Sequence, residues 1–208
     1  MMRTLAIDCA TEACSVALFE GERLLAHDHR LLGRGHAEHL VPMIAALPDR
    51  GRAARILVSR GPGSFTGVRI GLATARALAL AWQAKALAYP TLALVAALAR
   101  ADHPDAPVSV AMSGGHGEWF VCDFGEDGLP EGPVISLAPA QAAGRARHPL
   151  VAGTQAASLV ALRGQGTALD LLPDARLALQ VPPALQSDDL SPDYGRAPDA
   201  RPAKALPA

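Results

Sequence analysis

The pattern of apolar and polar positions predicts strands at the start of the chain. Two short apolar runs, residues 4–8 and 15–19, are separated by a polar turn, and residues 23–29 follow a second turn. Three consecutive strands are the simplest assignment for this pattern. Residues 56–59 form a fourth run that is largely apolar, as expected of a short buried strand.

Apolar residues at helical spacing predict three helices in the first half. Residues 36–47 form the first candidate, in which Pro42 is tolerable as a kink or near an end. Residues 66–84 are small or apolar on more than one side, so this second helix is either buried within its own domain or partly covered by another chain. Residues 86–89 then predict a strand, and residues 90–99 predict a helix with a proline in its first turn.

The second half repeats the order of the first in a shorter form. Residues 108–112 and 118–124 predict two strands around a glycine-rich turn, which suits a duplicated fold of the actin and kinase kind. Residues 100–107 are polar and contain prolines, so they mark the boundary between two lobes. We expect an α/β protein with lobes at residues 1–103 and 104–181 and a proline-rich, extended tail at residues 182–208.

Composition narrows the class of protein. The chain has 208 residues and is 50% hydrophobic, so it can bury a substantial core, while its net charge of −1 disfavours electrostatic binding of a long nucleic acid. Cys9, Cys14 and Cys122 include no Cys-x-x-Cys pair and are expected to be small buried residues, not disulfides or zinc ligands. The N-terminus turns polar too early for a signal peptide, and no apolar run reaches the roughly 20 residues of a membrane helix. We therefore expect a cytoplasmic protein.

A glycine-rich turn connects the strand at residues 56–59 to the long helix. Its glycines permit close backbone approach, and a hydroxyl side chain can cap the first free N–H groups of the helix. A Walker A loop would need a lysine where Val68 stands, and the glycines are spaced too widely for a dinucleotide fingerprint. A structural turn is the favoured interpretation. Its residues are Gly61, Gly63, Ser64, Thr66 and Gly67.

Residues 61–71 read Gly-Pro-Gly-Ser-Phe-Thr-Gly-Val-Arg-Ile-Gly and precede an alanine- and leucine-rich helix. This stretch closely resembles the signature of the TsaB family, the bacterial partner subunit in the synthesis of threonylcarbamoyladenosine in transfer RNA. The resemblance is strong over residues 8–98 and weaker beyond, where residues 192–196 are similar to the Tyr-Leu-Arg segment that closes the family. It implies a duplicated fold of the actin, sugar-kinase and heat-shock ATPase kind, with a mixed sheet and packed helices in each lobe.

The resemblance implies a non-catalytic subunit that binds a TsaD-like catalytic subunit, forms a homodimer when alone, works with a TsaE-like ATPase and reaches transfer RNA indirectly. In TsaD-like proteins two histidines four residues apart bind the catalytic metal. Thr91 and Val95 stand at those positions here, so metal and catalysis are expected to be absent, with ATP or ADP bound only in the assembled complex.

The same resemblance predicts a partner surface on the helices at residues 36–47 and 66–82. A charge at Leu72 is expected to abolish the complex while leaving the monomer folded. The residues of the predicted surface are His36, His39, Leu40, Met43, Leu47, Val68, Gly71, Leu72, Ala75, Leu78, Ala79 and Trp82.

Two loops resemble phosphate-binding elements. The actin superfamily opens with a carboxylate at the end of the first strand and a threonine in the turn, which would direct Asp8 toward a metal and Thr11 toward phosphates. The turn after the strand at residues 108–112 resembles the phosphate loop of TsaD, although a β-turn that has drifted in sequence is the favoured alternative. The candidate residues are Asp8, Thr11, Ser113, Gly114, Gly115 and His116.

Three other interpretations stay open. His36 and His39 are three residues apart and could share a helix face as metal ligands, but their spacing matches no zinc motif and an interface role is favoured. A small ATPase or kinase of the actin-like superfamily would use the two candidate loops as phosphate sites. A peptidase is the least favoured class, because no serine, histidine and aspartate arrangement or zinc motif stands out.

Overall fold

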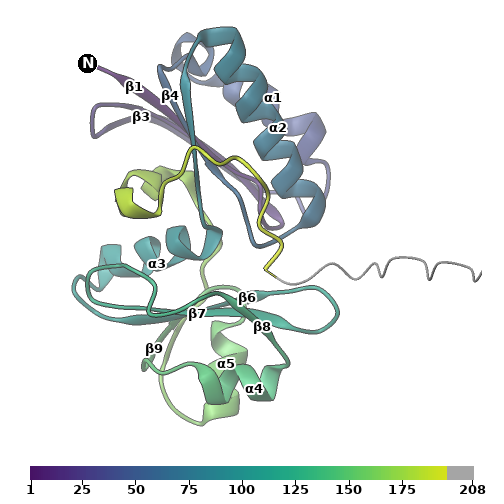
Figure 1. Cartoon of the computed structure of the whole chain (residues 1–208), viewed down its shortest axis with the longest axis vertical. Helices are drawn as coiled ribbons and strands as arrows, with labels where there is room; N and C mark the ends of the chain where they lie inside the picture. Colours follow the sequence, from purple (N-terminus) through teal and green to yellow (C-terminus); the bar gives the residue numbers. More distant parts are fainter. Residues whose placement is uncertain (196–208) are drawn as a thin grey trace, which may run out of the picture.

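A mixed five-stranded sheet forms the centre of the first lobe in the computed structural model, which describes residues 1–195 (Figure 1). Its strand order is β3-β2-β1-β4-β5. β2 is antiparallel to its two neighbours β1 and β3, whereas β4 and β5 run parallel to β1. The strands are β1 (Arg3–Asp8), β2 (Ala13–Glu20), β3 (Arg23–Leu31), β4 (Arg55–Ser59) and β5 (Lys85–Tyr89).

Helices cover both faces of this sheet. On one face, α1 (His36–Ala46) and α2 (Phe65–Trp82) lie next to each other, with the short helix η1 (Pro48–Gly51) following α1 (Figure 1). On the other face, α3 (Thr91–Asp102) lies between the two sheets. Successive side chains of β1 point to opposite faces of the sheet, so both faces are apolar. Leu5 packs in the core under α1 and α2, whereas Ala6 packs in the core around α3.

The second lobe is a smaller sheet with the order β10-β9-β6-β7-β8. The strands are β6 (Val108–Ser113), β7 (Trp119–Phe124), β8 (Ile135–Leu137), β9 (Leu150–Ala152) and β10 (Thr167–Leu169). Two short helices, α4 (Pro139–Arg145) and α5 (Ala156–Arg163), cover the face that points away from α3 (Figure 1).

The two lobes have the same topology. Read from one edge, the first sheet is β3-β2-β1-β4-β5 and the second is β8-β7-β6-β9-β10, so each strand of the first has a counterpart of the same rank in the second. Each lobe begins with an antiparallel hairpin, β1–β2 in the first and β6–β7 in the second. A later strand then pairs in parallel with the first strand of that hairpin, β4 with β1 and β9 with β6. The structure thus confirms the predicted fold class, a duplicated two-lobe fold of the actin-like kind.

The end of the described chain returns to the first lobe. After η2 (Ala175–Gln180) and η3 (Pro183–Leu185), residues 187–195 run along the first lobe beside α2, and we call this segment the strap (Figure 1). Ser187 exchanges two backbone hydrogen bonds with Ala88, and the Asp193 N–H donates to the Arg60 carbonyl. This part of the predicted tail is packed against the first lobe. Residues 196–208, including Arg196 of the predicted closing segment, lie outside the described residues.

Every helix within residues 1–195 is too short or too polar to cross a bilayer.

The glycine-rich turn holds the start of α2 against the turn between β1 and β2. A side chain at Gly67 would overlap the carbonyl oxygen of Cys9, and one at Gly63 would overlap that of Ala10. The Ser64 N–H donates to the Ala10 carbonyl over 2.7 Å, and the Ser64 hydroxyl caps α2 by accepting from the Gly67 N–H. These contacts agree with a structural turn, in which the glycines are needed for backbone proximity.

We predict that Gly67→Ala lowers the free energy of unfolding by about 2–3 kcal/mol, because the added methyl group meets fixed backbone. Gly71→Ala is the matched control in the same helix. A methyl group there would lie 3.6 Å from the nearest Val58 methyl carbon, so the change should be neutral or stabilising by up to about 1 kcal/mol. Urea unfolding followed by circular dichroism measures both, and equal effects of the two changes would contradict the packing described here.

Candidate functional site

Polar side chains gather where the parallel strands of the first sheet end. Asp8 ends β1, Ser59 ends β4 and Tyr89 ends β5, while Thr91 begins α3. The Ser59 and Thr91 hydroxyl oxygens are 2.6 Å apart. The Tyr89 hydroxyl donates to the Ile7 carbonyl over 3.0 Å and lies 3.4 Å from the Asp8 carboxylate. In open α/β sheets, ligands commonly bind at the carboxyl ends of the parallel strands. Whether this cluster can bind a ligand therefore depends on how accessible its side chains are.

The Asp8 carboxyl group is enclosed by the protein. It is 1% exposed, and its Oδ1 accepts a hydrogen bond from the Ala10 N–H over 2.9 Å. Burial raises the pKa of Asp8 to about 6, with a small further rise from the nearby Asp174 carboxylate, against the opposing effect of hydrogen bonds from Ala10, Ser59 and Tyr89. The carboxyl group that the resemblance directs toward a metal is therefore buried and hydrogen-bonded within the lobe.

The polar groups of the turn after β1 are also hydrogen-bonded within the protein. The Thr11 hydroxyl accepts from the Ala13 N–H, and the Ala10 carbonyl accepts from the Ser64 N–H. The glycine-rich turn covers this stretch so closely that side chains at Gly63 and Gly67 are excluded. The first predicted phosphate loop is thus a packed structural turn.

The second predicted phosphate loop is more accessible. Ser113 is exposed at the end of β6, and the turn beyond it closes with a hydrogen bond from the Gly114 N–H to the Glu118 carbonyl. Gly115 and His116 are exposed at the tip, where His116 has a left-handed φ of 61°. Asp8 and this turn have separate neighbours in different lobes, so the structure does not join the two predicted loops into one phosphate site.

Sequence reasoning missed two residues beside the second loop. The Thr154 hydroxyl accepts from the Ser113 N–H over 3.0 Å, and the Gln155 side-chain amide donates to the Ser113 hydroxyl over 2.8 Å. Both follow β9, which runs parallel to β6 and brings them to the same sheet edge. The signal in the sequence was the short apolar run at residues 150–152 followed by polar residues.

The candidate metal residues separate in the structure. His36 is buried and its Nε2 lies 3.2 Å from the Ala13 carbonyl oxygen, so it ties α1 to β2, whereas His39 is exposed. Thr91 and Val95, at the positions of the expected TsaD metal ligands, are both fully buried in the core. Over residues 1–195 there is no group of three or more His, Cys, Asp or Glu side chains arranged to hold a metal ion.

The three cysteines are buried and free, as predicted. The sulfur atoms of Cys9 and Cys14 are 3.6 Å apart beneath α2.

Most of the predicted partner-binding residues face the core, which corrects the sequence-based assignment. The apolar stripes of α1 and α2 point at their own sheet, as is usual for helices that cover one. A charge at Leu72, which is 1% exposed, would therefore unfold the lobe and would not act selectively on a complex. The buried members are His36, Leu40, Met43, Leu47, Val68, Gly71, Leu72 and Ala75; the half-buried members are Leu78, Ala79 and Trp82.

A different set of residues forms the outward surface of the same helices. Leu80 is 84% exposed and Val41 is 53% exposed, and small exposed side chains accompany them. We call this surface the outer face; it consists of Val41 and Ala45 of α1 and Ala73, Ala77 and Leu80 of α2. All five side chains of the outer face are apolar and exposed, and apolar surface on adjacent helices is a candidate for contact with another chain.

Comparison with known proteins agrees with this structural picture. Residues 30–131 match the family model described as "TsaD: tRNA N6-adenosine threonylcarbamoyltransferase". The structure of YeaZ from Pseudomonas aeruginosa superimposes with a TM-score of 0.79 at 30% sequence identity, covering 93% of this chain and all of that one. The protein is thus of the duplicated, two-lobe actin-like fold class, and the YeaZ structure shares its fold.

Curated relatives narrow the class further. The chain is 37% identical over 131 residues to the tRNA threonylcarbamoyladenosine biosynthesis protein TsaB of Escherichia coli, and 30% identical over 124 residues to that of Bacillus subtilis. These matches include 61% and 57% of this chain and 56% and 53% of the relatives, so the chain spans about half the length of the curated relatives it matches. Together with the YeaZ structure, they show that the chain belongs to the TsaB family, which confirms the predicted resemblance.

We predict that Asp8→Asn stabilises the protein at pH 8 and not at pH 4. Because the folded-state pKa is about 6, against 3.8 for a free side chain, the folded protein holds this proton more tightly, and stability falls as pH rises from about 4 to 6. Above that range the full cost of the buried charge is present, so removing the charge should raise the free energy of unfolding by about 3 kcal/mol.

Chemical unfolding at the two pH values measures this difference. Asp102→Asn, at an exposed position at the end of α3, is the control and should show no such dependence on pH. A variant at Asp8 that is equally destabilised at both pH values would contradict the prediction.

Proposed function

We propose that this protein is a non-catalytic subunit that supports synthesis of threonylcarbamoyladenosine in transfer RNA by binding a TsaD-like catalytic subunit through its outer face. The names of the curated relatives support the reaction. The exposed apolar side chains of the outer face, with Leu80 at 84% exposure, are the observation that carries the binding role. The proposal assigns binding to the outer face because the polar groups at the ends of the parallel strands are buried and bonded within the protein.

The match to the TsaD family model explains why a TsaD-like protein is the partner we favour. The matched segment, residues 30–131, includes both α1 and α2. A protein of that family would carry a corresponding helix pair, so the two pairs can meet across a pseudo-twofold axis. Two copies of this chain can meet by true twofold symmetry in the same way. We therefore also propose a homodimer when the partner is absent.

A binding role without catalysis is supported by the polar groups described above. Asp8 is enclosed, and Thr91 and Val95 replace the expected histidine ligands inside the core. We propose that ATP or ADP, a TsaE-like ATPase and transfer RNA are engaged only by the assembled complex, in the cytoplasm. The contacts at Asp8 give no support to the small ATPase or kinase, and the peptidase likewise gains none from the contacts described above.

We predict that Leu80→Glu weakens association with the TsaD protein of the same organism by at least tenfold, because a carboxylate would be buried in the interface without a partner. The monomer should remain folded, since Leu80 is exposed. Isothermal titration calorimetry measures the affinity, and light scattering during size-exclusion chromatography reports the homodimer.

Leu162→Glu provides the matched control. Leu162 is 55% exposed on α5, which covers the far face of the second lobe, so the same chemical change is made away from the outer face. Wild-type affinity of the Leu80 variant, or equal losses for both variants, would refute the proposed surface.

A further inference from the structure

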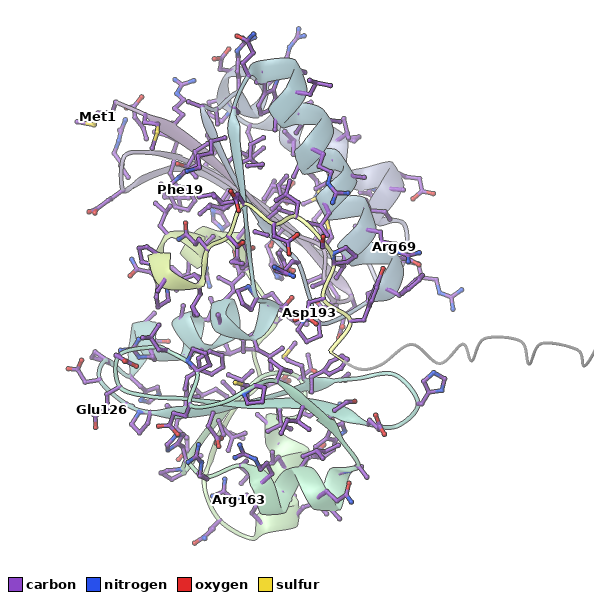
Figure 2. All side chains as sticks on the ribbon, in the orientation of Figure 1. Met1, Phe19, Arg69, Glu126, Arg163 and Asp193 are labelled. Carbon is purple, nitrogen blue, oxygen red and sulfur yellow. The ribbon has the colours of Figure 1, made fainter. Side chains whose placement is uncertain are left out.

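The strap is held firmly against the first lobe along its length. Ser187 and Ala88 exchange hydrogen bonds of 2.7 and 2.9 Å, and the Asp193 N–H donates to the Arg60 carbonyl over 2.8 Å. Between these points, Leu190 packs against the core beneath α1 and α2. Figure 2 shows Asp193 beside the end of α2 that carries Arg69. The strap is therefore a fixed neighbour of α2.

Both charged residues of α2 are engaged by the strap. Within Phe65–Trp82 the sequence has two charged residues, Arg69 and Arg76. The Arg69 Nε donates to the Tyr194 hydroxyl over 2.9 Å, and an Arg76 terminal nitrogen donates to the Leu190 carbonyl over 2.9 Å. The two arginines are seven positions apart, about two helical turns, so they lie along the same edge of α2.

Aromatic rings fix the position of Arg69 further. The Phe65 and Tyr194 rings stack with centroids 5.1 Å apart and planes at 29°. The guanidinium carbon of Arg69 lies 3.6 Å from the centre of the Phe65 ring and 5.4 Å from that of Tyr194. The hydrogen bond to Tyr194 and the cation–π contacts with both rings therefore stabilise the Arg69 guanidinium group in this position.

We propose that the strap is a positioning element for the outer face, with Tyr194 and the Leu190 carbonyl holding Arg69 and Arg76 at its edge. The α2 part of that face, Ala73, Ala77 and Leu80, then stays free of neighbouring charge, because the strap holds both guanidinium groups. This inference rests on the proposed function, since it names what sets the affinity of the same surface. Released guanidinium groups would be buried without partners, and in a twofold pairing they would also face like charges.

The test begins with Tyr194→Ala in the full chain. It should weaken association with the TsaD protein of the same organism by about tenfold, while Arg69→Met alone leaves the affinity within about threefold of wild type. In the double variant Tyr194→Ala/Arg69→Met, association should return to within about threefold of wild type, because methionine keeps an apolar stem without the charge. A strap that served only to stabilise the fold would not be rescued in this way.

Two further measurements separate charge release from general damage. Raising the salt concentration from 0.05 to about 0.5 M should reduce the loss of homodimer affinity that Tyr194→Ala causes, since screening weakens repulsion between the guanidinium groups of the two copies. Tyr194→Phe keeps the ring stack and removes the hydroxyl acceptor, so it should bind about threefold more weakly at an unchanged melting temperature. Tyr194→Phe therefore tests whether the Tyr194 hydroxyl positions Arg69, even where Tyr194→Ala lowers the stability of the protein.

The results distinguish this inference from the proposed function. If Leu80→Glu does not affect association, the outer face is not the interface and both proposals fail. If Leu80→Glu abolishes association but Tyr194→Ala does not weaken it, or the double variant binds as weakly as Tyr194→Ala, the outer face stands and the positioning role of the strap is overturned.

Discussion

The close contact between the glycine-rich turn and the turn after β1 determines the arrangement of the first lobe. Side chains are excluded at Gly63 and Gly67 because the Ala10 and Cys9 carbonyl groups occupy their space. This proximity places the beginning of α2 directly over the end of β1 and sets which residues of α2 meet the sheet. It also leaves the opposite edge of the helix beside the strap, where Arg69 and Arg76 find their acceptors.

The same contact changes what an actin-like architecture can do. In such a fold the ends of the parallel strands are the natural place for a ligand, and here that place holds Asp8, Ser59, Tyr89 and Thr91 bonded to one another and to the backbone. The accessible features of the first lobe are instead on the outside of its helices. The fold is thus retained, while the ends of its parallel strands are closed by the side chains of the chain itself.

Local patterns in the sequence predicted the elements well and their exposed faces poorly. Alternation and apolar runs located the first strands and the two helices, because those signals depend on neighbouring residues. The small residues on all sides of α2 gave little indication of which side is inner, so Leu72 was assigned to the surface and Leu80 was not. β8 and β10 are three residues long and carry almost no pattern. The sequence predicted the strap only as part of an extended tail, because its contacts are distant in sequence: Tyr194 meets Arg69 across 125 positions of the chain.

The position of α3 has a consequence for motion between the lobes. Its residues 91–99 are all buried, and they share one core with Ala6, Phe19 and Leu57 of the first sheet and with Val110, Met112 and Phe120 of the second. Opening the lobes like a hinge would expose several large apolar side chains of this helix, each costing roughly 1.5–3 kcal/mol. Separating the lobes is therefore costly, so the shared core around α3 sets the orientation of α1 and α2 relative to the β6–β7 turn of the other lobe.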